Sequence, residues 1–182
     1  IQPFIVMEVL ERAQTLDALG KDIVHLEVGE PDFPTPPPVK EAAVRALAED
    51  DTHYTHSLGK LALREEICRS YWEKYRVDVS PDRVIVTSGT SPGMLLVFSA
   101  LLDGAEDIIM PNPYYACYPN FVRYLGGRPV MVPVEEHDGF KYRIEEIKSR
   151  LSPLTRAVIV NSPANPTGAV FTGRDYEAIA DL

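Results

Sequence analysis

The chain of 182 residues has few of the features that mark membrane, secreted or metal-binding proteins. Its two cysteines, Cys68 and Cys117, lie far apart and form no ligand pattern, so we interpret them as reduced thiols of a cytoplasmic protein and expect no metal site. No apolar run approaches the ~20 residues that a membrane-spanning helix needs. Charged residues interrupt the first 19 residues, so no signal peptide is predicted and no membrane partner is expected.

Basic residues are also scarce. The sequence has 18 Lys and Arg against 27 Asp and Glu, a formal net charge of -9. A nucleic-acid-binding face needs an excess of basic residues, so no nucleic-acid partner is expected. The glycine-rich fingerprints of dinucleotide and nucleoside triphosphate sites, G-x-G-x-x-G and G-x-x-x-x-G-K-[ST], are both missing. The hydrophobic fraction of 45% is ordinary for a globular protein with a real core.

Short apolar segments alternate with amphipathic ones along most of the chain. Helices are predicted over residues 6–19, 38–49, 61–75, 92–102, 115–125, 143–150 and 173–182, and strands over residues 23–28, 83–87, 107–110, 129–134 and 156–161. This alternation predicts an α/β fold with three layers, in which helices cover both faces of a mostly parallel sheet. The last helical pattern runs to Leu182 without a stop signal, so we expect the natural protein to be longer.

A turn suited to binding an anion follows the strand predicted at residues 83–87. Ser91 is a good N-cap and Pro92 a good first helical residue. The backbone amides of Gly89, Thr90 and Ser91 then point toward an anion, and the helix dipole adds to the attraction. An ordinary capped turn between a strand and a helix explains the same residues, and the turn alone does not decide between the two interpretations.

Two further loops follow predicted strands, so they lie at the same edge of the sheet as the anion turn. The loop over residues 111–119 holds several tyrosines, which either stack on a flat heterocycle or simply pack. The loop over residues 161–168 presents the amide of Asn165 to a ligand oxygen, or is an ordinary proline turn. An anion site, an aromatic plate and an amide donor at one edge together favour a phosphorylated aromatic heterocycle as the ligand.

Five motifs then make the chain recognisable. They are Gly29-Glu30-Pro31-Asp32-Phe33, Tyr54-Thr55 with Gly59 and Leu63-Arg64-Glu65, Thr87-Ser88-Gly89-Thr90, Pro113-Tyr114-Tyr115, and Asn165-Pro166-Thr167-Gly168. In this order and at this spacing, the chain resembles the N-terminal half of the pyridoxal-phosphate (PLP) aminotransferases of class I and II, the fold-type-I proteins related to aspartate aminotransferase. The resemblance covers nearly the whole chain.

The resemblance implies a role for each matched residue. Gly89, Thr90 and Ser91 match the cradle of the cofactor phosphate, Tyr115 matches the ring that stacks on the pyridine, and Asn165 matches the donor to the phenolic oxygen of PLP.

The resemblance also implies an assembly and a division into domains. Gly29 matches the glycine that approaches the substrate carboxylate. Tyr54 matches the tyrosine that reaches the PLP phosphate of the partner subunit, which implies a homodimer. Residues 1–35 are expected to belong to the small domain and its linker, and residues 36–182 to the large PLP-binding domain.

The implied activity is transfer of an amino group between an amino acid and a 2-oxo acid. None of the six lysines matches the lysine that forms the Schiff base, so no catalytic residue is assigned and the 182-residue chain is expected to be inactive alone. Pro92, which has no N–H, and residues 101–107, where the family commonly has Pro-Gly-Asp, are smaller departures. A carbon–sulfur lyase, an enzyme similar to aminocyclopropane-carboxylate synthase, and a non-catalytic ligand-sensing domain of a regulator stay open as alternatives.

Overall fold

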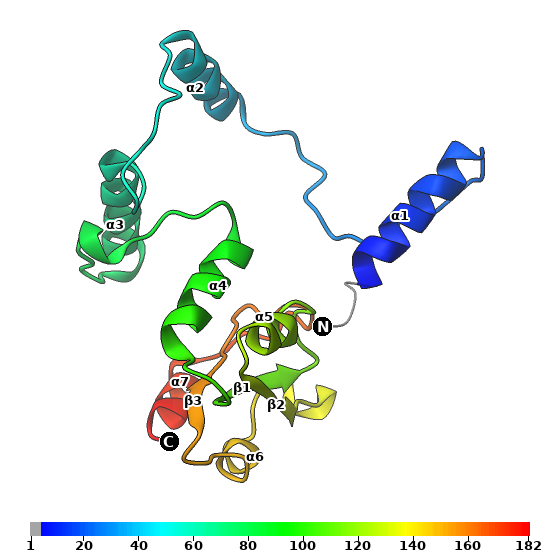
Figure 1. The fold of residues 1–182 in the computed structure, drawn as a ribbon, viewed down its shortest axis with the longest axis vertical. Coiled ribbons are helices and arrows are strands. Elements are labelled where there is room, and N and C mark those ends of the chain that lie inside the picture. The colour runs from blue at the N-terminus through cyan, green and yellow to red at the C-terminus, as the bar shows by residue number, and fades with distance from the viewer. Residues whose placement is uncertain (1–4) are drawn as a thin grey trace. The chain divides into compact units, whose positions relative to one another are not determined.

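The computed structural model describes residues 5–182 (Figure 1) and divides into two compact units. The sheet unit comprises Thr90–Leu182 together with the residues up to Thr15. The helical unit comprises Leu16–Gly89. The first helix, α1 (Ile5–Ala18), contributes residues to both units.

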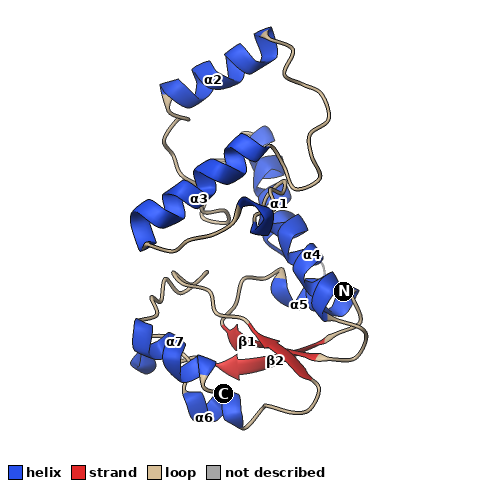
Figure 2. Cartoon of the chain, turned by 90° about the vertical axis from the view of Figure 1, so that its left-hand side faces the viewer, coloured by secondary structure: helices blue, strands red, loops and turns tan. Residues whose placement is uncertain are grey.

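Three parallel strands form the sheet, as predicted. They are β1 (Asp107–Asn112), β2 (Arg128–Pro133) and β3 (Thr155–Val158), in the spatial order β2-β1-β3. All three are labelled in Figure 1, and Figure 2 labels β1 and β2. Parallel sheets are normally covered on both faces, and their central strands therefore read as continuous apolar runs. The central strand β1 follows this rule, because Ile108, Ile109 and Met110 are all fully buried.

The alternation of side chains along β1 divides the core into two halves. Ile108 and Met110 pack with residues of α4 (Thr90–Leu101) and α5 (Tyr118–Tyr124) on one face of the sheet. Ile109 points to the other face, where it packs with Ile147 of α6 (Ile144–Lys148) and Ile179 of α7 (Gly173–Ala180). This arrangement confirms the three-layer α/β/α architecture that the sequence predicts.

The order of the strands creates a crevice at one place along the sheet. The central strand β1 and its neighbour β3 are both followed by helices, but α5 covers one face and α7 covers the other. The loops that leave these two strands therefore diverge at their carboxyl ends. Open α/β sheets bind their ligands at such switch points.

An ion pair between the buried Asp107 and the exposed Arg128 fixes the opposite end of β1. The carboxylate of Asp107 accepts hydrogen bonds from Arg128 Nε at 2.6 Å and Nη2 at 2.7 Å, and from Ser152 Oγ at 3.1 Å. The hydrogen bonds from Arg128 are the main reason why the pKa of Asp107 lies below its ordinary value. Because Asp107 starts β1 and Arg128 starts β2, the pair holds the two strands in register.

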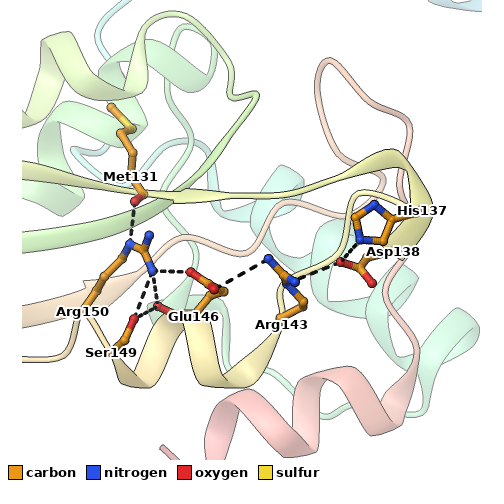
Figure 3. Close-up of polar contacts among 7 residues, drawn as sticks. All are labelled: Met131, His137, Asp138, Arg143, Glu146, Ser149 and Arg150. Atoms are coloured by element: carbon orange, nitrogen blue, oxygen red, sulfur yellow. Dashed lines mark hydrogen bonds and ion pairs between the residues drawn. The ribbon is translucent and has the colours of Figure 1, made fainter.

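The short helix α6 is fastened to the sheet by Arg150 (Figure 3). Its Nε donates to the carbonyl oxygen of Met131 in β2 at 3.0 Å, and its Nη1 donates to the Glu146 carboxylate at 2.6 Å. Glu146 also faces Arg143, which in turn faces Asp138. The hydrogen bond to Met131 and the packing of Ile147 against the sheet explain how a helix of five residues keeps a defined position there.

The helical unit contains α2 (Pro37–Ala48), α3 (Leu61–Tyr75) and a 3-10 turn, η1 (Pro81–Arg83). Arg64 of α3 is buried, and it donates to the carbonyl oxygens of Gly59 at 3.2 Å and Pro81 at 2.8 Å. Gly59 has φ +97°, and a Cβ added there would lie 2.7 Å from Cβ of Val86. The loop before α3 and the segment after η1 are thus held together at one point.

Two predicted strands are wrong. Residues 23–28 and 83–87 are extended or irregular, because a strand needs a hydrogen-bonded neighbour and neither segment pairs with one within residues 5–182. Residues 84–87 make one backbone hydrogen bond to a neighbouring segment, from Val86 N–H to the Leu58 carbonyl oxygen at 2.9 Å.

Some helix boundaries also differ from prediction. Helix α4 begins at Thr90, so Ser91 and Pro92 lie in its first turn, and Ser91 is not the N-cap. Helix α5 begins at Tyr118 rather than at residue 115. Its Pro119 occupies an early helical position, where a missing N–H costs nothing. The other helices match their predicted ranges closely, and the predicted domain boundary at residue 35 stays a prediction.

Candidate functional site

An open cavity of about 360 Å³ lies at the carboxyl ends of β1 and β3. Side chains from the start of α4, the β1–α5 segment and the loop after β3 line it: Thr90, Met94, Tyr115, Tyr118, Phe121, Asn161, Pro163 and Asn165. Three residues that the sequence assigns to the cofactor, Thr90, Tyr115 and Asn165, are thus brought together. None of the lining residues carries a formal charge.

The anion end of the cavity is the beginning of α4. Thr90 and Ser91 occupy the first turn, where backbone N–H groups have no carbonyl one turn earlier to pair with. Gly89 differs from the prediction, because its N–H donates to the Thr87 carbonyl oxygen at 2.8 Å and is not free. Gly89 has φ +93°, and an added Cβ would meet no atom within 4 Å, so the glycine is explained by backbone conformation.

Two tyrosines form the aromatic wall. Tyr115 and Tyr118 meet edge to face, with ring centroids 5.4 Å apart and an interplanar angle of 75°. Cys117 beside Tyr115, together with burial, raises the pKa of the Tyr115 hydroxyl, and burial raises the pKa of Tyr118. Both rings are therefore uncharged at neutral pH. Tyr118 was not singled out from the sequence, although its place three residues after Tyr115 is a signal that was available.

The loop after β3 carries Asn165 at its exposed tip. The backbone N–H of Asn165 donates to Oδ1 of Asn161 at 2.8 Å. Two backbone bonds close the turn, from Gly168 N–H to the Ala164 carbonyl oxygen at 2.7 Å and from Ala164 N–H to the Ala169 carbonyl oxygen at 2.9 Å. Asn161 is a second residue that sequence reasoning did not select, and its position four residues before Asn165 was the only hint.

Partly buried polar contacts lie at the two ends of this loop. The hydroxyl of Tyr142 donates to the Ile159 carbonyl oxygen at 2.7 Å, and burial raises its pKa. At the far end, Lys141 Nζ lies 2.7 Å from Oδ2 of Asp175, which also takes part in the capping box of α7. The hydrogen bond from Lys141 is the first reason why the pKa of Asp175 falls to about 2.

Gly29 and Tyr54 belong to the helical unit. Gly29 lies in an irregular segment, and the side chain of Tyr54 is fully exposed. The structure describes that unit by itself, so the roles predicted for both residues stay predictions.

Two further observations concern residues 5–182. Within this range, no three His, Cys, Asp or Glu side chains gather as ligands of a metal ion. No helix in the same range is both long and apolar enough to cross a membrane.

The fold, the switch-point cavity and the three motif loops around it define a class of protein, and comparison with known proteins agrees. The chain belongs to the aminotransferase class I and II family, whose model matches residues 21–182.

Named relatives and solved structures are similar to this chain over about half of their own length. The (5-formylfuran-3-yl)methyl phosphate transaminase of Methanocaldococcus jannaschii is 42% identical over 97% of this chain and 45% of its own. The aspartate aminotransferase of Geobacillus stearothermophilus is 38% identical over 100% of this chain and 46% of its own. The structure of aspartate aminotransferase from Thermus thermophilus with maleate superposes with a TM-score of 0.95 at 39% identity. The match covers 100% of this chain and 47% of that one. The chain thus has the aspartate aminotransferase-like fold.

Proposed function

We propose that this chain supplies the phosphate, ring and phenolic-oxygen contacts of a PLP-dependent aminotransferase. The observation that carries the proposal is the meeting of Thr90, Tyr115 and Asn165 around one cavity at the switch point of the sheet. These residues come from three separate segments, each of which carries one of the motifs matched in the sequence.

The residues present fit PLP in kind. The first turn of α4 offers the free amides of Thr90 and Ser91 and the positive end of the helix dipole to a phosphate. The ring of Tyr115 is held at an angle to Tyr118 and offers a face to a flat heterocycle. The exposed side chain of Asn165 offers an N–H to an anionic oxygen. PLP, when bound, supplies the electron sink for chemistry at the α-carbon of an amino acid.

The residues of this cavity bind and orient the cofactor, and none of them moves a proton in the proposed reaction. No lysine is among the described residues that line it, so none of these residues can hold the cofactor covalently as an imine. We therefore propose that the 182-residue chain alone does not catalyse transamination. The named relatives are transaminases and aminotransferases, which favours amino transfer over carbon–sulfur elimination.

The whole protein is proposed to act on an amino acid and a 2-oxo acid, as a homodimer. Gly29 is assigned to the substrate carboxylate and Tyr54 to the cofactor phosphate of the partner subunit. Both assignments follow from the matched motifs and from membership of the family.

The test is a titration of the intact protein with PLP, followed by absorbance, and an intact mass after reduction with borohydride. Tyr115→Ala removes the stacking ring and is expected to weaken PLP binding about tenfold or more, since aromatic stacking contributes on the order of 1 kcal/mol and burial adds to it. Tyr124→Ala is the matched control, because Tyr124 is the last residue of α5 and does not line the cavity. Failure of the wild-type protein to bind PLP, or equal losses in both variants, would refute the proposal.

A further inference from the structure

Asn161 occupies a special place in the loop after β3. It is half-buried, it lines the cavity, and it lies at the end of the segment that leaves the sheet. Its Oδ1 accepts the backbone N–H of Asn165 at 2.8 Å. A backbone N–H pairs only with an acceptor, so this contact fixes which end of the Asn161 amide faces the turn.

The contact is the one side-chain bond that holds Asn165 within residues 5–182. The other bonds of the turn join Ala164 to Gly168 and to Ala169, and Ala169 to the hydroxyl of Thr167, so none of them involves Asn165. The side chain of Asn165 itself is exposed and makes no hydrogen bond within the described part of the chain. The direction in which Asn165 presents its amide therefore depends on the backbone that Asn161 holds.

We propose that Asn161 is a positioning residue, which acts on the cofactor by fixing the backbone of Asn165. This inference rests on the proposed function, because it presumes that Asn165 donates to PLP. Removing the acceptor leaves the Asn165 N–H without its partner and lets the tip of the turn adopt other conformations. The fraction of molecules in which Asn165 is ready to donate then falls, and the apparent affinity for PLP falls with it.

The variants Asn161→Ala and Asn161→Asp separate the acceptor from the rest of the side chain. Alanine removes the acceptor, whereas aspartate keeps an oxygen in place for the Asn165 N–H. In the protein without PLP, amide hydrogen exchange at Asn165 is expected to rise about tenfold in Asn161→Ala and to stay close to wild type in Asn161→Asp, as is usual when a local hydrogen bond is lost or kept. The same exchange rate in Asn161→Ala and wild type would overturn the proposal.

A double-mutant cycle with PLP tests whether the effect passes through Asn165. Asn161→Ala is expected to weaken PLP binding several-fold in the wild-type background and to have no further effect in Asn165→Ala. A full effect in both backgrounds would mean that Asn161 acts by another route, and would overturn the inference alone. A wild-type protein that does not bind PLP refutes the proposed function instead, so the two failures are distinguishable.

Discussion

The two units of the chain bury different kinds of residue. All of the buried apolar side chains of residues 5–182 lie in the sheet unit, including Ile108, Ile109 and Met110 of β1. In the helical unit the one buried residue within Leu16–Gly89 is a charged one, Arg64. Large apolar side chains there are exposed instead, and Val24 and Leu26 are 81% and 89% accessible.

The difference shows that each unit is stabilised internally by a different kind of interaction. The sheet unit is stabilised by apolar burial on both faces of β1, which is the main favourable term in folding. The helical unit has polar contacts instead, among them the hydrogen bonds from Arg64 to two carbonyl groups. Exposed apolar surface of this extent is typical of a surface that contacts other protein. The cavity lies in the unit that has its own core, which gives its walls fixed positions.

The largest expected effect comes from the centre of the sheet. Ile109→Ala removes a fully buried side chain between β2, β3 and α6, and is expected to lower the free energy of unfolding by about 2–5 kcal/mol. Urea unfolding of the intact protein measures the change. Val24→Ala is the matched control, because the same kind of truncation at an 81% exposed residue is expected to cost less than about 0.5 kcal/mol. Equal effects at the two positions would abolish the contrast between the units.

A smaller effect is expected in the helical unit. Arg64→Ala leaves the carbonyl oxygens of Gly59 and Pro81 without their donor and is expected to cost about 1–3 kcal/mol. Hydrogen exchange should show the loss within Leu16–Gly89 and leave β1 protected. Arg69→Ala is the control, since Arg69 pairs with Glu66 and Glu73 on the exposed face of the same helix, where ion pairs contribute about 0–1 kcal/mol. Loss of protection in β1 would show that the units do not open separately.

The sheet unit was also the part whose fold could be predicted. The apolar runs at β1, β2 and β3 pair with one another, so periodicity alone located them. The runs at residues 23–28 and 83–87 are also rich in Val and Ile, but they find no partner strand in the described chain and do not form strands. A strand depends on a neighbour that its own sequence does not encode. Composition alone therefore cannot separate these two outcomes.

The candidate site was predicted in part for a similar reason. Tyr115 and Asn165 sit in motifs that follow β1 and β3, and Thr90 begins α4, which packs on the same sheet, so the three meet at one cavity. Tyr118 and Asn161 were missed because they act through neighbours, one by ring contact and one by a hydrogen bond to the backbone. Such contacts depend on the path of a loop, which no short pattern determines. The engagement of the Gly89 N–H by Thr87 was missed for the same reason.

The smallest expected effect is a pH dependence at the start of the helical unit. His25 lies between two carboxylates, with Nδ1 2.6 Å from Glu27 Oε1 and Nε2 2.7 Å from Asp17 Oδ2. The hydrogen bond to Glu27 first, and then that to Asp17, raises the pKa of His25 above its ordinary value of 6.5. Because the folded-state pKa is raised, the contribution of this cluster to stability is fully present below the unfolded-state pKa and is lost as the pH rises through the folded-state pKa.

An NMR titration of the His25 ring measures its pKa directly, and Asp17→Asn is expected to move the midpoint back toward 6.5.

The Lys141–Asp175 pair of the sheet unit is expected to respond at acidic pH instead. The pKa of Asp175 is lowered to about 2, so the contribution of that pair is lost only as the pH falls toward that value. A His25 midpoint at or below 6.5 would show that the two carboxylates do not hold the ring in solution. The contrast in pH response between the two units would then disappear.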